Sequence, residues 1–494
     1  MVWMEQQKVS LDRQKGRSLL WTLIIAGLVT TMNTTTVSIA LPSYMQIFHV
    51  DLATVQWVVV GYMLPLGMMM PLSGYLGERL GYRRAFLLMM AAIGVCSLGC
   101  ALAWNFQALV FWRVLKGVAA GIVTPYSMSL LYRYIGHDLQ PHYLGIATMT
   151  QSFGVAVGPA LSGLLLQFAS WRILFLVNLP LVVLAIWGGL RTLPKESAAK
   201  TQEPIDLPGI LLVTAGTGAV LVGFTYLENW GVRSPLFWGA VLGGAALVIV
   251  FVVRQLHTAH PLLNFAVLGY RPFAVALVVN CVMAMTMGIN GILNMLYMQN
   301  LLGYTPFAAG LMMLIPSLAM LGGTWLSDRL FGRITHRTLV AVGLFIAAAG
   351  NFGMSHNGLE TTAVMILCAL CLRYIGLGLV QMPLADYGMS GIDSQLTGHA
   401  SAMFNWGRQT ATVVSTNILT IVLSLNITRY WYAAGQTGLP AEGTQAYAQA
   451  SMRAIDSDYR YLAIALLASA VLTLAAMRRT QTTEGIPDGI SPKA

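Results

Sequence analysis

The stretch GYLGERLGYRR, residues 74–84, recurs in outline as TWLSDRLFGRITHR, residues 324–337. In each copy an acid, an arginine and a leucine are followed by a second arginine after two intervening residues, and Glu78 and Asp328 hold the same place. Each copy follows a long apolar run and forms a short polar corner at its end. Two copies of one corner indicate that the chain contains two related helical bundles.

Outward from these corners, the composition is that of a chain immersed in lipid. Of the 494 residues, 56% are hydrophobic and only 9% are charged, whereas a soluble domain carries roughly 25% charged residues. This excludes a soluble enzyme. The net charge of +10 does not indicate nucleic-acid binding, because the basic residues lie in short loops between apolar runs.

The apolar runs also give a topology. A helix needs about 20 mostly apolar residues to cross a bilayer, and the chain contains fourteen such runs, so both ends lie on one side. Most basic residues outside the runs fall on the side of the N-terminus, which predicts that both termini are cytoplasmic. The opposite side receives Arg172, Arg233, Arg429, Arg453 and Arg460. Residues 426–459 are expected to form the longest outer loop.

These runs divide the chain into four parts. We expect a six-helix bundle over 1–193, linkers with two extra membrane helices over 194–271, a second six-helix bundle over 272–479, and a cytoplasmic tail over 480–494.

Three more stretches complete a set of motifs. They are RVLKGVAAGIVTP (113–125), GVAVGPALSG (154–163) and WRILFLVNLP (171–180). With the 74–84 corner and fourteen runs, the chain resembles the major facilitator superfamily, specifically its fourteen-helix drug:proton antiporter branch. The resemblance implies an all-α membrane fold of two six-helix bundles plus two inserted helices. It also implies a multi-pass protein of the inner or plasma membrane that exports small amphiphilic compounds by alternating access, in exchange for protons. A periplasmic adaptor is compatible with this branch, but nothing in the sequence requires one.

The resemblance assigns roles to two of the motifs. The two corners are expected to latch a cytoplasmic gate. The gate residues are Gly74, Glu78, Arg79, Arg83, Asp328, Arg329 and Arg333. In the fifth run the exporter motif comprises Gly154, Gly158, Pro159 and Gly163, and small residues four apart let helices pack closely. Since Pro159 also lacks a backbone donor, we expect a tight, hinge-like contact across the cavity.

Polar residues inside the runs predict a cavity. Asn33, in MNTTTVSIALP (32–42), lies roughly 21 Å above the start of its run and shares a depth with Arg113. Lys116 lies near the middle of the bilayer. In the family the Asn33 position is usually an aspartate and the Lys116 position a glutamine, so we expect an electropositive cavity in which Asn33 and the threonines are neutral hydrogen-bonding partners of these cations or of a substrate. Further lining is expected from Met287, Asn290, Asn294, Tyr297, Asn405 and Arg408.

The electropositive cavity leaves the coupling chemistry open. Lys116 and Asp386 are the candidate proton sites. One alternative is an exporter or facilitator of organic anions or anionic lipids without proton coupling. Another is a non-transporting sensor on the same fold. Because no histidines stand at ligand spacing within a run and no phosphate-binding loop is present, we expect neither a metal nor another cofactor.

Overall fold

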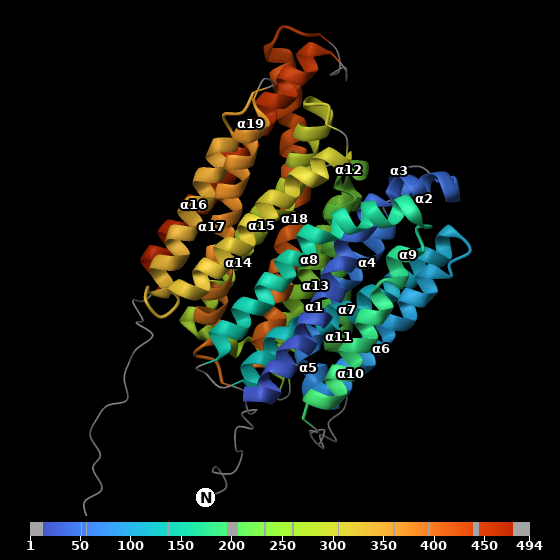
Figure 1. Cartoon of the computed structure of the whole chain (residues 1–494), viewed down its shortest axis with the longest axis vertical. Helices are drawn as coiled ribbons and strands as arrows, with labels where there is room; N and C mark the ends of the chain where they lie inside the picture. Colours follow the sequence, from blue (N-terminus) through green and yellow to red (C-terminus); the bar gives the residue numbers. More distant parts are fainter. Residues whose placement is uncertain are drawn as a thin grey trace, which may run out of the picture.

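The chain folds into a bundle of long, roughly aligned helices (Figure 1). The computed structural model describes residues 13–50, 52–55, 57–135, 139–194, 206–231, 234–258, 261–304, 306–358, 361–393, 396–437 and 444–477. Within these ranges no β-strand forms, and one isolated β-bridge joins Phe331 to Ile334.

The N-terminal half runs from α1 to α10. Its helices are α1 (Arg13–Ile39), α2 (Leu41–Phe48), α3 (Leu52–Val55), α4 (Trp57–Met69), α5 (Leu72–Leu80), α6 (Tyr82–Ala101), α7 (Phe106–Tyr134), α8 (Gln140–Phe168), α9 (Ile173–Leu176) and α10 (Asn178–Thr192). Helices α4 and α5 meet at 63°. The break falls at Pro71, the N-cap of α5, because proline cannot donate the backbone hydrogen bond that would continue the helix.

A helical hairpin follows, made of α11 (Leu207–Thr225), α12 (Leu227–Trp230) and α13 (Pro235–Leu256). Asp206 fixes its base, because its carboxylate accepts hydrogen bonds from the Gly209 amide (3.0 Å), Arg254 (2.9 Å) and Gln255 (2.8 Å). The hairpin packs against both halves: Gly67 of α4 leaves room for Leu221 of α11 and for Gln409 of the C-terminal half.

The C-terminal half begins at a 3-10 turn, η1 (Phe265–Gly269), and contains a π-helical segment, η2 (Leu296–Leu301). Its helices are α14 (Arg271–Met295), α15 (Pro306–Leu330), α16 (His336–Met354), α17 (Ala363–Met389), α18 (Thr397–Ala433) and α19 (Gln445–Ala476). The repeated corners seen in the sequence fall at corresponding places, the end of α5 and the end of α15.

Most of these helices are long and apolar enough to cross a membrane. Among the described residues, 11 spans meet this test, and the bent pair α4–α5 raises the number to 12. Helices α1 and α8 are not in this count, but with 27 and 29 residues they are also long enough to cross a bilayer. Including them makes the arrangement consistent with the fourteen predicted runs. The fold is therefore an all-α membrane bundle with two six-helix halves and two inserted helices.

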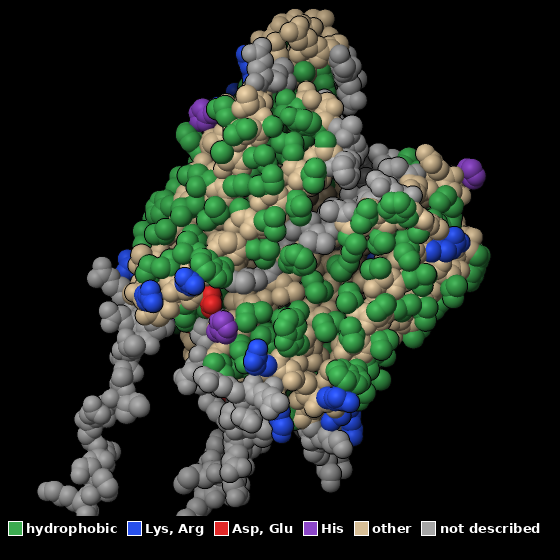
Figure 2. Space-filling model, viewed as in Figure 1, with side chains coloured by type: hydrophobic (Ala, Val, Ile, Leu, Met, Phe, Trp, Pro, Cys, Tyr) green, Lys and Arg blue, Asp and Glu red, His purple; other side chains and the backbone are tan. Residues whose placement is uncertain are grey.

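The surface fits a lipid environment. Large apolar side chains such as Trp21 (61% exposed), Leu211 (62%) and Val364 (68%) face outward. Figure 2 shows hydrophobic side chains covering the flank, with lysines and arginines gathered mostly towards the lower end, where α5 and α10 lie in Figure 1. We call this the α5 end of the molecule.

The expected outer loop over 426–459 is shorter than its predicted bounds, because helices enter this stretch from both sides. Helix α18 continues to Ala433, and α19 already begins at Gln445. With 37 and 32 residues, these helices are about 55 and 48 Å long, well beyond the roughly 30 Å of a hydrocarbon core. Polar residues in this stretch therefore belong to helices that extend past the bilayer.

Candidate functional site

A cavity lies between the two halves and contains about 820 Å³ of unfilled space, part of it open to solvent. Helices α7 and α8 line it from one half, and α14, α17 and α18 from the other. The lining residues are Thr124, Ser127, Met128, Leu131, Leu144, Ala147, Asn280, Met283, Ala284, Met287, Gln381, Leu384, Ala385, Phe404, Asn405 and Arg408. Flexible methionines beside amides and hydroxyls suit amphiphilic ligands of varied shape.

Arg408 is the single charged residue among the described residues of this lining. Its Nη2 donates to the Asn405 Oδ1 at 3.3 Å, and the Asn405 Nδ2 donates to the Ser401 carbonyl oxygen at 2.9 Å. Asn280 donates to the Phe404 carbonyl oxygen at 3.1 Å and so joins α14 to α18. Three residues of the predicted set, Met287, Asn405 and Arg408, are thus brought together around the cavity.

Arg113 does not line this cavity. It is 0% exposed inside the N-terminal half, donates to the carbonyl oxygens of Val58 (2.7 Å) and Asn33 (3.2 Å), and places its guanidinium 4.5 Å from the centre of the Tyr62 ring. The Asn33 amide itself donates to the Val29 carbonyl oxygen at 2.7 Å. The two residues do meet, as their shared depth predicts, but through the Asn33 main chain.

Lys116 is also sealed within the N-terminal half, at 0% exposure. Its Nζ lies 5.4 Å from the centre of the Phe175 ring, and no acceptor among the described residues reaches it. We expected Arg113 and Lys116 to line the cavity together. They do not, because the face of α7 that carries both residues packs against α4 and α9.

Three residues predicted on the same face as Met287 turn into the C-terminal half instead. Asn290 donates to the Thr286 carbonyl oxygen, and the Asn294 Oδ1 accepts from the Tyr459 hydroxyl at 2.6 Å. The Tyr297 hydroxyl donates to the Gly358 carbonyl oxygen at 3.0 Å. All three are buried, at 2% exposure or less: Asn290 bonds within α14, Asn294 joins α14 to α19, and Tyr297 bonds the connection between α16 and α17.

The acids of the repeated corners pair with histidines of the opposite half. Glu78, near the end of α5, lies 3.3 Å from the Nε2 of His399 at the start of α18. Asp328, near the end of α15, lies 3.0 Å from the Nδ1 of His142 at the start of α8. The two contacts follow the same pattern with the halves exchanged. The sequence alone does not identify these histidines as partners of the acids, because each histidine lies in the opposite half of the chain from the acid that it contacts.

The arginines of the corners have other partners. Arg79 donates to the Tyr75 hydroxyl at 2.8 Å, and Arg83 donates to the Leu190 carbonyl oxygen at 2.7 Å. The Arg329 guanidinium lies 4.4 Å from the Trp325 ring, and Arg333 is exposed. Gly74 packs directly against the backbone at Gly398, so the two halves approach closely at the α5 end.

The helix of the glycine motif, α8, packs against α1 in its own half and against α15 of the opposite half. Gly154 leaves room for Thr31 of α1, in its own half, and the Ser162 hydroxyl donates to the Gly158 carbonyl oxygen at 2.6 Å. Pro159 and Gly163 belong to the same helix, but their packing lies outside the described residues.

Asp386, the other candidate proton site, lies in α17 beside the cavity. Its Oδ2 is 3.0 Å from the Nε2 of His336, the first residue of α16, and both residues are less than 9% exposed. Among the described residues, no group of three or more His, Cys, Asp or Glu side chains could hold a metal ion.

Comparisons with known proteins match this architecture. The sequence model of the Major Facilitator Superfamily matches residues 23–416. The chain is 28% identical to the lincomycin resistance protein LmrB of Listeria monocytogenes over 88% of this chain and 92% of the relative. It is 27% identical to the tetracenomycin C resistance and export protein of Streptomyces glaucescens over 83% and 76%. The solved proton:xylose symporter XylE, at 13% identity, superposes with a TM-score of 0.64 over 93% of this chain and 95% of the symporter.

Proposed function

Because the chain belongs to the Major Facilitator Superfamily, we propose that it exports small amphiphilic compounds by alternating access, in exchange for protons. The observation that carries the proposal is the cavity between the halves, whose lining mixes methionines with amides and hydroxyls. Resistance and export relatives that cover most of the chain support export as the direction.

In this proposal the protein lies in the inner or plasma membrane with the α5 end and both termini on the cytoplasmic side, as the distribution of basic residues predicts. The Glu78–His399 and Asp328–His142 contacts would then close the cytoplasmic side while the cavity empties outward. No adaptor protein is needed for this cycle.

An efflux measurement tests the proposal. Cells that lack their own pumps are loaded with a panel of anionic, neutral and cationic dyes, and we expect the protein to lower the accumulation of some of them. Ala284→Trp fills the cavity and should abolish the effect. Val253→Trp, at a 52% exposed surface position of α13, is the matched control and should retain it. Equal accumulation with and without the protein across the panel would contradict export.

A second candidate function is export or facilitated passage of organic anions without proton exchange. The presence of Arg408 as the one charged lining residue favours it, because a guanidinium binds carboxylates and phosphates well. A proton signal in proteoliposomes upon substrate addition separates the two functions: the exchanger acidifies or alkalinises the lumen, and the facilitator does not. Preference for anionic over matched cationic dyes, lost in Arg408→Gln, would support the anion candidate.

A further inference from the structure

We propose that His336 and Asp386 form the site that binds and releases the exchanged proton, an inference that rests on the proposed proton exchange. The pair joins the start of α16 to the end of α17 through the 3.0 Å contact between Nε2 and Oδ2. At 8% and 7% exposure, both side chains are screened from bulk solvent. Buried ionisable residues in membrane transporters are costly and commonly mark proton pathways.

Asp386 of this pair follows two cavity-lining residues in sequence, although neither Asp386 nor His336 is among the described lining residues. Leu384 and Ala385 of α17 line the cavity, and Asp386 is the next residue along the helix. Across the interface, Leu131 of α7 lines the cavity, and Tyr132 follows it. A substrate in the cavity would therefore contact residues of α17 and α7 that stand next in sequence to Asp386 and Tyr132.

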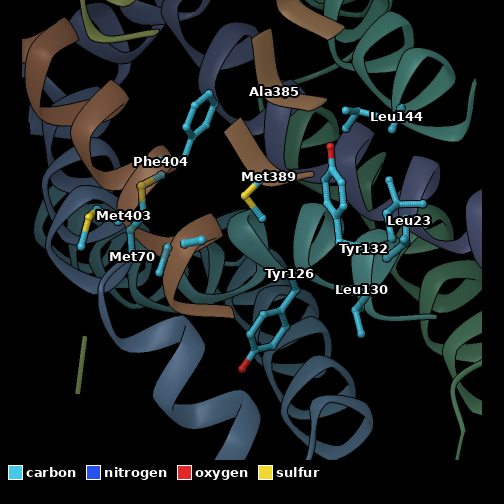
Figure 3. Packing of buried hydrophobic residues seen from close by; sticks show 14 of the residues in the cluster. Leu23, Met70, Tyr126, Leu130, Tyr132, Leu144, Ala385, Met389, Met403 and Phe404 are labelled. Carbon is cyan, nitrogen blue, oxygen red and sulfur yellow. The ribbon is translucent and has the colours of Figure 1, made fainter. Parts of the chain in front are cut away.

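The pair also lies near a buried polar group of the other half of the protein. The Tyr132 hydroxyl is buried close to Asp386 but has no hydrogen-bond partner among the described residues, and Figure 3 shows this hydroxyl directed to the side on which Ala385 and Leu144 lie. Without the extra proton, the pair is a neutral imidazole and a carboxylate, with a net charge of −1, and a small approach of the two halves would let the tyrosine donate to it. One added proton gives an imidazolium and a carboxylate with no net charge and weakens that contact. Proton binding would thus loosen the halves at the α5 end, and proton release would restore the contact.

Neighbouring charged groups are largely engaged elsewhere. On α7, the Arg133 guanidinium lies 5.0 Å from the Tyr82 ring. On α8 and α15, His142 and Asp328 pair with each other. The side chains packed on the His336 ring are Phe331, at 5.0 Å, and Tyr387 of α17, at 6.3 Å between ring centres. Arg337, next to His336 in sequence, and the exposed Arg333, three residues before it, are further charges close along the chain.

Lys116, the alternative proton site, lacks these features. It is enclosed in the N-terminal half beneath Phe175. A proton on Lys116 would have no direct contact with the other half.

Two transport modes in proteoliposomes test the proposal, with a dye identified in the efflux panel. Uptake driven by a pH gradient requires proton binding and release. Counterflow, the exchange of labelled for unlabelled dye, requires only binding and reorientation. We expect Asp386→Asn and His336→Gln to lower gradient-driven uptake at least tenfold while counterflow stays within about twofold of wild type and loses its pH dependence. Asp386→Glu should restore part of the gradient-driven uptake.

The control variant is His257→Gln, because His257 is an exposed histidine at the end of α13 whose Nδ1 bonds a local carbonyl oxygen, that of Val253. It should behave as wild type in both modes. Gradient-driven uptake that survives in both pair variants would overturn the proposal. Equal loss of both modes would overturn it too, because it would assign the pair a structural role. A wild-type protein that exchanges dye without any response to pH would instead refute the proposed proton exchange itself.

Discussion

At the scale of single residues, the contact between Gly74 and Gly398 sets how closely the two halves approach. A Cβ at position 74 would lie 2.9 Å from the Gly398 carbonyl carbon and 3.0 Å from the His399 nitrogen. Both neighbours are backbone atoms, which cannot rotate away as a side chain can. Glycine is therefore required here for close approach of helices from opposite halves.

Gly74→Ala should accordingly separate α5 from α18. We expect a cost of about 1–3 kcal/mol to the closed α5 end, the usual range for overpacking, and a fall in dye efflux of about tenfold or less. Gly243→Ala is the control, since a Cβ there would meet nothing within 4 Å. The measurement is efflux rate at matched membrane expression, and equal rates for both variants would contradict the close approach.

The same scale shows what the sequence could predict about the site. Counting residues along the runs placed Asn33 and Arg113 at one depth, and they touch. Depth does not give direction around a helix, however. Helix α7 is packed on several sides, so its charged face could not be assigned to the cavity or to the bundle from one sequence. Arg408 was assigned to the cavity and lines it; its part in transport stays a prediction.

At the scale of elements, the inserted hairpin is held at its base by Asp206, which stands just before the α11 span. Burial acts to raise the pKa of this carboxyl, but hydrogen bonds from Gln255, the Gly209 amide and Arg254 outweigh it and hold the pKa below its ordinary value. The charged form is thus favoured in the folded protein. Its contribution to stability is complete above the unfolded value of about 3.9 and is lost as the pH falls through the lower folded value.

Asp206→Ala should therefore destabilise the folded protein at neutral pH. We expect a loss of about 1–3 kcal/mol from the removed cap and charged hydrogen bonds, and a smaller difference from wild type at pH 3. Thermal unfolding of purified protein at both pH values is the measurement. Asp206→Asn, which keeps an acceptor for the Gly209 amide, should lose less. A difference that grows towards pH 3 would contradict the sign derived above.

The helices were predicted well where hydropathy alone marks a membrane span, and poorly where a helix continues beyond its apolar run. Long apolar runs gave the spans, and the positions of the two corners gave the relation between halves. The bounds of the 426–459 loop were too wide because they rested on where the apolar runs stop, whereas α18 and α19 continue as helices past those runs and support each other.

At the scale of the whole molecule, the two halves meet through two equivalent contacts: in each, an acid of one half contacts a histidine of the other. Glu78 reaches from α5 to α18, and Asp328 reaches from α15 to α8. Each pair is partly exposed and contributes modestly, about 0–1 kcal/mol for an accessible ion pair. Together they bias the α5 end towards closure without locking it, which a cycle of opening and closing requires.

Bridging the halves at this end should stop transport. In a Cys368→Ser background, Glu78→Cys with His399→Cys is treated with a short bifunctional thiol reagent. We expect efflux to fall to the level of cells without the protein and to recover after reduction. Each single-cysteine variant receives the same treatment and should keep its activity. Full activity of the bridged double variant would show that this end need not open.

Helices α18 and α19 extend beyond the bilayer as a rigid pair, joined where the Tyr430 hydroxyl bonds Ser457 at 2.8 Å. A particle of this mass buried in a detergent micelle offers few landmarks for image alignment. The projecting pair provides one, and antibody fragments raised against it would give electron cryomicroscopy a fiducial on a surface remote from the α5 end.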